Sequence, residues 1–193
     1  RQAIAMAIDR QRIVDQFYPP GSDPASHFTP CAIPLGCEGD EWYEFDVEGA
    51  QALLAAAGLP NGFSTVLNYR DVVRGYLPDP NVVAQELQKQ LQDNLGITAE
   101  IQVMESSAFL DDSADGLLNG FYLLGWGADY PDPTNFLDYH FGSGSGKKFG
   151  TPFPDIVAEL NKGVATADPA ARTAAYTMKA ATPTFSPAWM RVP

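Results

Sequence analysis

The chain has 193 residues, of which 45% are hydrophobic and 11% aromatic, a composition typical of a folded protein and not of a disordered one. Its 24 acidic and 12 basic residues give a formal net charge of −12. This charge argues against nucleic acid or an anionic membrane as a partner, because both require a concentrated basic surface.

Two short helices are predicted before the first proline pair, and Asp9 is suited to cap the second of them. Arg1 already lies inside the first helical pattern, without a cap or leader, so we expect an excised part of a longer protein. Residues 22–44 are rich in Pro, Gly and Asp and predict a long loop. The length of the chain predicts one domain over residues 1–193.

Cys31 and Cys37 are the only cysteines, and both lie in this loop. In an exported protein their spacing allows a small loop closed by a disulfide, with two unpaired thiols as the alternative. A zinc site is disfavoured, because His27 and His140 are the only histidines and supply no recognisable ligand spacing.

Helix and strand patterns alternate through the middle of the chain. A helix capped by Asp46 ends at Gly58, a strand is predicted over 63–69, and a helix from about Asn81 ends at Gly96. A strand over 98–104 is predicted next, half-buried because Ala99, Ile101 and Val103 alternate with polar residues, and a helix over 107–118 follows. Strands that alternate with helices indicate an α/β fold.

Residues 121–124 form a continuous apolar run, typical of a strand covered on both faces. Pro131 and Pro133 then prevent further pairing, so a rigid loop follows that carries Trp126 and Asp129. We expect this loop at the carboxyl end of the strand, where open α/β sheets bind ligands. A flexible Gly/Ser connector over 142–146, a helix over 154–164 and a helix capped by Asp168 are predicted to follow.

Three side chains are candidates for binding. Asp129 can pair with a ligand ammonium, or can be a turn aspartate that binds its own backbone. Trp126 offers an apolar surface to a ligand or packs in the core. Arg74, in the loop after the 63–69 strand, can bind a carboxylate through its planar fork or can be a solvated charge.

The sequence gives little support to an enzymatic function. Residues 142–146 contain the string Gly-x-Ser-x-Gly, but they follow a loop and not a strand. No phosphate-binding glycine loop follows a strand, and Asp129 and Asp132 give no reason for the opposed geometry of a glycosidase pair. An α/β-hydrolase-like or glycoside-processing domain is one alternative, and a domain that binds only a protein partner is another.

Five segments together carry a resemblance to a known family. They are Arg1–Arg10 (RQAIAMAIDR), Asp46–Gly58 (DVEGAQALLAAAG), Leu95–Ile101 (LGITAEI), Gly125–Leu137 (GWGADYPDPTNFL) and Asp168–Arg172 (DPAAR). In this order and spacing they resemble the family 5 extracellular solute-binding proteins, the dipeptide, oligopeptide and nickel receptors of ABC importers.

The resemblance implies a lobe like that of type II periplasmic binding proteins, with a central mixed sheet flanked by helices. It further implies that residues 1–193 are most of the C-terminal lobe, and that partners are a peptide or other small solute, the ABC permease and the N-terminal lobe. The resemblance implies a protein with no nucleic-acid partner, no cofactor and no catalytic activity. The expected location is the periplasm or the cell exterior, with a lipid anchor in Gram-positive-type organisms.

The same resemblance assigns roles to residues. Asp129 corresponds to the aspartate that holds a peptide α-ammonium, Trp126 to a tryptophan that lines the pocket, and the backbone of Gly127 to a segment along the ligand. Arg74 corresponds to an arginine that takes the ligand carboxylate, with Tyr76 nearby. Ser106 stands where dipeptide-binding relatives carry a tryptophan, so a longer peptide, or a non-peptide solute such as an oligosaccharide or a nickel complex, is an alternative ligand.

Overall fold

The computed structural model describes residues 1–38 and 41–177. The described chain divides into two compact units and passes between them repeatedly, and the single domain over residues 1–193 stays a prediction. Unit 1 comprises Arg1–Pro24, Tyr43–Asp112 and Leu117–Gly127. Unit 2 comprises Ala25–Trp42, Ser113–Gly116 and the residues from Ala128 onward. Each unit is described by itself below.

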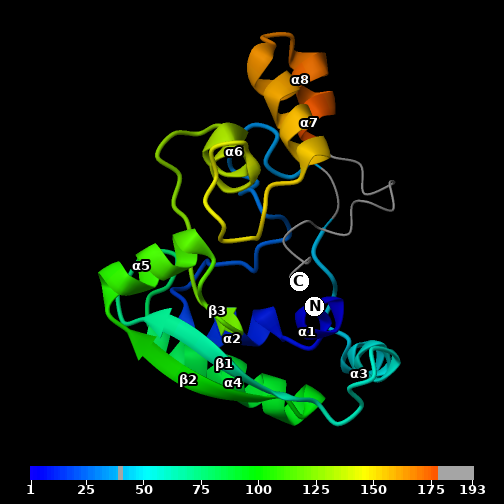
Figure 1. Cartoon of the computed structure of the whole chain (residues 1–193), viewed down its shortest axis with the longest axis vertical. Coiled ribbons are helices and arrows are strands. Elements are labelled where there is room, and N and C mark those ends of the chain that lie inside the picture. Colours follow the sequence, from blue (N-terminus) through cyan, green and yellow to red (C-terminus); the bar gives the residue numbers. More distant parts are fainter. Residues whose placement is uncertain (39–40, 178–193) are drawn as a thin grey trace. The chain divides into compact units, whose positions relative to one another are not determined.

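Unit 1 is built on a three-stranded sheet (Figure 1). Its helices and strands are α1 (Gln2–Met6), α2 (Arg10–Phe17), α3 (Val47–Ala56), β1 (Ser64–Arg70), α4 (Pro80–Leu95), β2 (Thr98–Met104), most of α5 (Ser106–Asp115) and β3 (Phe121–Tyr122). The strand order is β2-β1-β3, and both pairings are parallel. The α/β fold is confirmed, but the described strands form a parallel sheet and not a mixed one. Helices α4 and α5 connect successive strands, and such crossovers bring the next strand back in the same direction.

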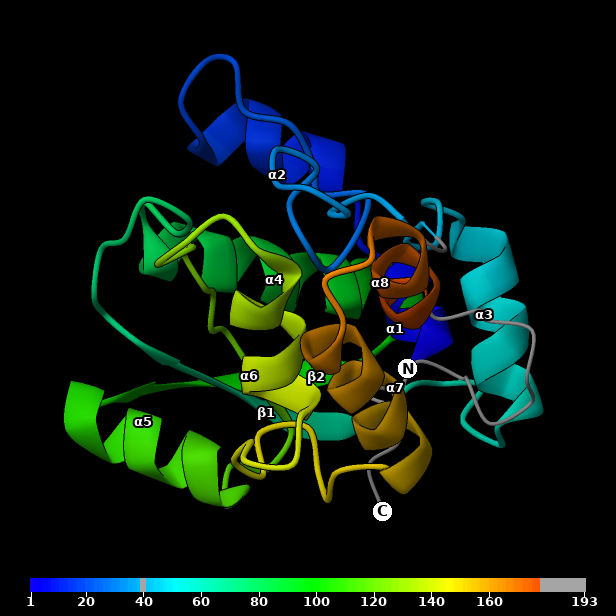
Figure 2. The same ribbon diagram turned by 90° about the horizontal axis from the view of Figure 1, so that it is seen from above.

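The two faces of the sheet have different neighbours. Leu67 and Tyr69 of β1 are 2% and 3% exposed and belong to a core that includes Leu91 and Leu95 of α4. Figure 2 shows α4 on one side of the strands and α5 on the other. Because side chains alternate along a strand, Asn68 and Arg70 project from the face opposite to Leu67 and Tyr69.

Two details of the predicted strands are wrong. The alternation in β2 predicted that Val103 is buried with Ala99, yet Val103 is 58% exposed, because β2 is an edge strand and the core does not extend to its end. Instead of a run covered on both faces, β3 has two residues, and 121–124 are all half-buried. Among the described strands β3 pairs with β1 alone, so it is also an edge of this sheet.

Most predicted helix ends are confirmed. Asp9, Asp46 and Asp168 each accept a hydrogen bond from the backbone N–H three residues later, which satisfies one free donor of the first helical turn. Gly96 follows α4 with φ of 67°, a conformation that glycine adopts without strain. No helix in the described ranges is long and apolar enough to cross a membrane.

Unit 2 has its own small core. Its elements after the 25–42 loop are the 3-10 helix η1 (Pro133–Asn135), α6 (Leu137–Phe141), α7 (Pro154–Ala165) and α8 (Pro169–Tyr176). Helices α7 and α8 pack side by side (Figure 1). The ring of Tyr176 lies close to Gly163. Between α6 and α7, the Ser145 N–H donates to the Gly142 carbonyl, and the Lys147 N–H donates to the Ala114 carbonyl. The flexibility of 142–146 stays a prediction.

Candidate functional site

The candidate site in unit 1 is the edge at which the three parallel strands end. Arg70, the last residue of β1, lies opposite Met104, the last residue of β2. Tyr122, the last residue of β3, lies opposite Asn68 of β1. All three strands therefore deliver their following loops to one edge, which is where open α/β sheets bind ligands.

A tight turn after β1 positions Arg74 and Tyr76. Arg74 and Leu77 exchange two backbone hydrogen bonds of 3.0 Å, so Tyr76 lies in the tip of the turn. The hydroxyl of Tyr18, which directly follows α2, donates to the Tyr76 carbonyl at 2.9 Å and fixes the turn to the body of unit 1. In all of these hydrogen bonds the turn takes part with its backbone groups.

The ring of Tyr76 packs directly on Gly125, the residue before Trp126. A Cβ built on Gly125 would overlap this ring, so only glycine permits the approach. Trp126 is half-buried. Gly127 is exposed, and a Cβ built on it would have no heavy atom within 4 Å, so its backbone is open to a ligand.

The remaining two predicted residues are exposed. The Arg74 guanidinium donates to the carbonyl of its neighbour Val73 at 2.9 Å. Asp129 lies in unit 2, where its Oδ2 accepts a hydrogen bond of 3.1 Å from the Asn135 amide, and its N–H donates to Asn135 Oδ1 at 3.0 Å. Four predicted residues, Arg74, Tyr76, Trp126 and Gly127, thus share unit 1, and Asp129 does not belong to it.

Asp132 has a role that the sequence patterns did not reveal. As expected of a turn aspartate, it accepts hydrogen bonds from the N–H and the hydroxyl of Thr134, at 3.0 and 2.7 Å. It also receives two hydrogen bonds of 2.6 Å from Arg172 of α8. Partial burial raises the pKa of Asp132, but the Thr134 bonds and the Arg172 charge outweigh it and hold this pKa below its usual value. The bonds between Asp132 and Arg172 thereby connect the 125–137 and 168–172 segments, which both carry the family resemblance.

A second polar contact lies beside this pair. The Tyr176 hydroxyl donates to Asp138 Oδ2 at 3.1 Å, and the Arg172 guanidinium lies over the Tyr176 ring, 5.4 Å from its centre. Burial raises the pKa of both Asp138 and Tyr176. The polar atoms of these side chains bond to each other, and the contacts hold α8 to the 132–138 segment. Few hydrogen-bonding groups are therefore left for a ligand.

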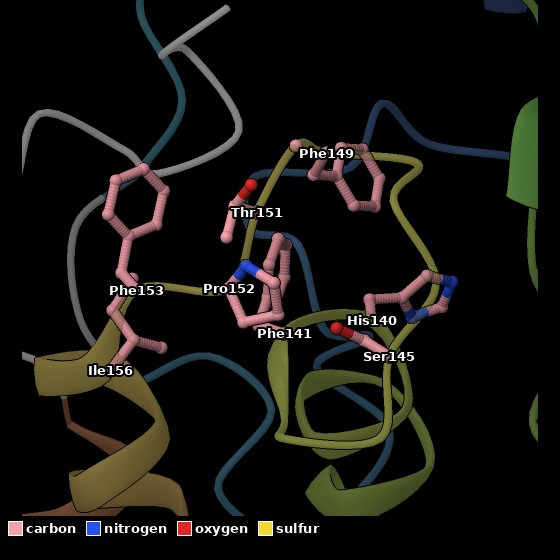
Figure 3. Close-up of a pocket in the computed structure, with 9 residues that line it drawn as sticks. His140, Phe141, Ser145, Phe149, Thr151, Pro152, Phe153 and Ile156 are labelled. Atoms are coloured by element: carbon pink, nitrogen blue, oxygen red, sulfur yellow. The ribbon is translucent and has the colours of Figure 1, made fainter. Parts of the chain in front are cut away.

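A small pocket in unit 2 is lined by aromatic side chains. Figure 3 shows Phe141, Phe149 and Pro152 at its centre, with His140 at one side. The space inside is ≈ 10 Å³, about enough for one water molecule. Burial lowers the pKa of His140, and its Nδ1 lies 2.6 Å from the Phe136 carbonyl, to which it donates. The pocket is too small for a solute and forms part of the core.

The cysteine loop also lies in unit 2. Cys31 and Cys37 are joined as a disulfide, with Cα atoms 4.8 Å apart, a separation ordinary for such a bond. His27 lies beside them, and its Nδ1 is 2.8 Å from the Ser26 hydroxyl. Sulfurs joined to each other offer no thiolate to a metal, so this arrangement closes a loop and supplies no metal site. The bond in the isolated protein stays a prediction.

Comparisons with known proteins identify relatives over most of the chain. Residues 1–148 match the family described as bacterial extracellular solute-binding proteins, family 5 Middle. The chain is 31% identical over 165 residues to the dipeptide-binding protein of Escherichia coli, covering 81% of this chain and 30% of that protein. It is 30% identical over 143 residues to heme-binding protein A of Haemophilus influenzae, covering 74% of this chain and 26% of that protein.

Solved structures give the same picture. A dipeptide-binding protein from Pseudoalteromonas in complex with Met-Leu matches with a TM-score of 0.82 and 27% identity, over 92% of this chain and 36% of that one. The periplasmic binding protein DppA from Helicobacter pylori in complex with the peptide STSA matches with a TM-score of 0.78 and 25% identity, over 91% and 34%. The chain therefore spans about a third of the length of these proteins.

Proposed function

Because the chain belongs to the bacterial extracellular solute-binding proteins of family 5, we propose that it serves to capture a peptide-like solute for an ABC importer. The observation that carries this proposal is the packing of Tyr76 on Gly125, which gathers Arg74, Tyr76, Trp126 and Gly127 at the carboxyl ends of the parallel strands. Two structural neighbours hold peptides, which supports a peptide as the solute.

We further propose that residues 1–193 are most of the C-terminal lobe of a two-lobe receptor. The support is the share of about a third that the chain covers in its structural neighbours. In such a receptor the two lobes close over the solute by a hinge motion, and no bond is made or broken. The receptor passes the solute to the permease from the periplasm or the cell exterior, held by a lipid anchor in Gram-positive-type organisms.

In this proposal the ligand groups and the side chains are matched by charge. Asp129 binds the peptide ammonium, for which the carboxylate oxygen that does not bind Asn135 is suited. Arg74 binds a carboxylate, Trp126 and Tyr76 supply apolar surface, and the open backbone of Gly127 lies along the ligand. A non-peptide solute is the second candidate, favoured by the relative named as a heme-binding protein.

The test uses the complete receptor and a peptide with a free or an acetylated N-terminus. Asp129→Ala should weaken binding of the free peptide by about 2 to 5 kcal/mol, because an ammonium is left without its partner in a closed cleft. The acetylated peptide, which has no charge there, should lose most of this sensitivity. Isothermal titration calorimetry measures both.

Asp129→Asn is the matched control, because the amide keeps the shape and can still bond to Asn135, and lacks only the charge. It should resemble Asp129→Ala in its effect on the free peptide and wild type in its melting temperature. An equal loss for free and acetylated peptides would defeat the assignment of Asp129.

A further inference from the structure

Arg70 is the last residue of β1, which is the central strand of the sheet. Its side chain is half-buried at the edge where the strands end, and it is the charged group built into the strand itself, whereas Arg74 lies on an exposed turn. A strand fixes the start of a side chain more firmly than a loop does, so Arg70 is the better anchored of the two cations.

Among the described residues, one hydrogen bond orients the Arg70 guanidinium. One of its terminal nitrogens donates to the hydroxyl of Ser106, the first residue of α5, at 2.8 Å. A guanidinium has five N–H donors, and a neutral hydroxyl takes one of them. Most of the donor fork therefore has no protein acceptor in the described part of the chain.

The acids next to Arg70 along the strand ends are already bound elsewhere. Asp71 accepts a hydrogen bond of 2.8 Å from the Asn81 amide, and Glu105 accepts from the backbone N–H groups of Ser107 and Ala108, which lower the pKa of Glu105. No carboxylate of the described residues lies within 4 Å of the Arg70 nitrogens.

Two other arginines of the chain have carboxylate partners, which Arg70 does not have in the described residues. Arg12 pairs with the buried Glu86 at 2.6 Å, and Arg172 binds Asp132 through two bonds. Arg70 is half-buried with a neutral partner, as is Arg10, which donates to the Tyr43 carbonyl; of these two, Arg70 lies at the edge where the strands end. A half-buried guanidinium is stabilised by an anion that takes its remaining donors, and a planar carboxylate matches the fork.

We propose that Arg70, held in place by Ser106, binds a carboxylate of the solute. The inference rests on the proposed function and narrows it to peptides that present a carboxylate at the end of β1. The carboxylate has two sources in a peptide, the C-terminus and an acidic side chain, and the experiment separates them.

The complete receptor is titrated with two matched pairs of tripeptides. Ala-Glu-Ala is compared with Ala-Gln-Ala for a side-chain carboxylate, and Ala-Ala-Ala is compared with its C-terminal amide for a terminal one. Wild type should prefer the charged member of one pair. Arg70→Gln should weaken binding of that member by about ten- to hundredfold, the range for a hydrogen-bonded ion pair, and leave the neutral member within about twofold.

Three further variants control for structure and charge. Lys89→Gln removes the same charge from the exposed face of α4 and should change no affinity. Arg70→Lys keeps the charge without the fork and should retain part of the preference. Ser106→Ala keeps the guanidinium but releases it, and should reduce the preference by a smaller factor than Arg70→Gln does. Melting temperatures verify that each variant is folded.

Equal weakening of both members by Arg70→Gln would overturn the inference, since it would mean that Arg70 only supports the fold. An unchanged preference, or the same loss with Lys89→Gln, would overturn it as well. If binding depends on Asp129 but not on Arg70, the inference fails and the proposed function stands. If wild type binds none of the four peptides, the peptide function fails, and the carboxylate assignment fails with it.

Discussion

Residues 121–127 end the sheet of unit 1, whereas residues 128–137 begin the second part of unit 2. In the first segment, Gly125 accommodates a tyrosine ring and Gly127 leaves open backbone. In the second segment, Asp129 binds Asn135 and Asp132 binds Thr134 and Arg172. One continuous sequence signature thus has an open half and a half that is held by its own contacts.

The arginines at the strand-end edge and the arginine of α8 differ in the same way. In the described part of the chain, Arg70 bonds to a hydroxyl and Arg74 to a carbonyl, while Arg172 of α8 is paired with a carboxylate. A paired charge stabilises the fold, and a charge without a counterion is available to a ligand. We therefore expect substitutions of Arg70 and Arg74 to change binding more than stability, and substitutions of the Asp132–Arg172 pair to change stability more than binding.

The largest expected effect is on peptide binding at the open half of the signature. It is measured on the chain without the N-terminal lobe that would close over the peptide. The 193-residue chain alone should bind peptide only at roughly millimolar concentration, at which about 4 kcal/mol is available. In water an ion pair is worth far less than in a closed cleft, while the entropic cost of association remains. Calorimetry of the isolated chain tests this. Micromolar binding would show that the site lies wholly within these residues, and the two-lobe clamp would have to be abandoned.

Asp132→Ala should be the most destabilising change in the second half. It removes acceptors for Thr134 and leaves the partly buried Arg172 without its carboxylate, at a cost of about 2 to 3 kcal/mol after allowance for partial exposure. Urea unfolding of the complete receptor measures the change. Asp132→Asn, which can still accept from Thr134, should cost less, and peptide affinity should stay within a few-fold. A large loss of peptide affinity at unchanged stability would contradict this expectation, because it would mean that Asp132 contributes to binding and not to the fold.

The next largest effect is expected on stability, from the disulfide of the cysteine loop. Replacing Cys31 and Cys37 with serine should lower the free energy of unfolding by about 2 kcal/mol, because a disulfide across a short loop restricts the unfolded chain. Peptide mapping without reductant should show the two residues linked. Freely alkylated thiols in protein refolded under oxidising conditions would mean that the loop keeps them apart.

Local structure was predictable wherever one residue type determines it. Asp9, Asp46 and Asp168 begin helices and Gly96 ends one, because caps depend on short-range hydrogen bonds and backbone freedom. Long-range relations were not predictable in this way. The exposure of Val103 depends on its place in an edge strand, and the pairing of Asp132 with Arg172 joins residues forty positions apart.

The candidate site was predictable only in part, and for the same reason. The proline-bounded loop after the strand indicated where Trp126 lies, and the resemblance supplied Arg74 and Tyr76. The contact of Tyr76 with Gly125 requires the folded turn. Arg70 has no sequence signal at all, since a strand that ends in arginine is common. Only its single hydroxyl contact and the bound state of its neighbouring acids distinguish it.

The smallest effect is a pH dependence that belongs to unit 2. Burial lowers the pKa of His140, and the charge of Lys148 adds to this, against the opposing effect of the Phe136 carbonyl. The unfolded chain therefore binds a proton at His140 more readily than the folded chain, with a pKa of about 6.5. Stability that is present above this pH is lost as the pH falls through it, with a slope of at most ~1.4 kcal/mol per pH unit for one proton. Urea unfolding at pH 7.5 and 5.5 should thus show a greater loss for wild type than for His140→Gln, while peptide affinity at pH 7.5 is the same for both. An identical pH dependence in the two proteins would show that His140 is protonated without cost, and a changed affinity would mean that the aromatic pocket of unit 2 contributes to binding.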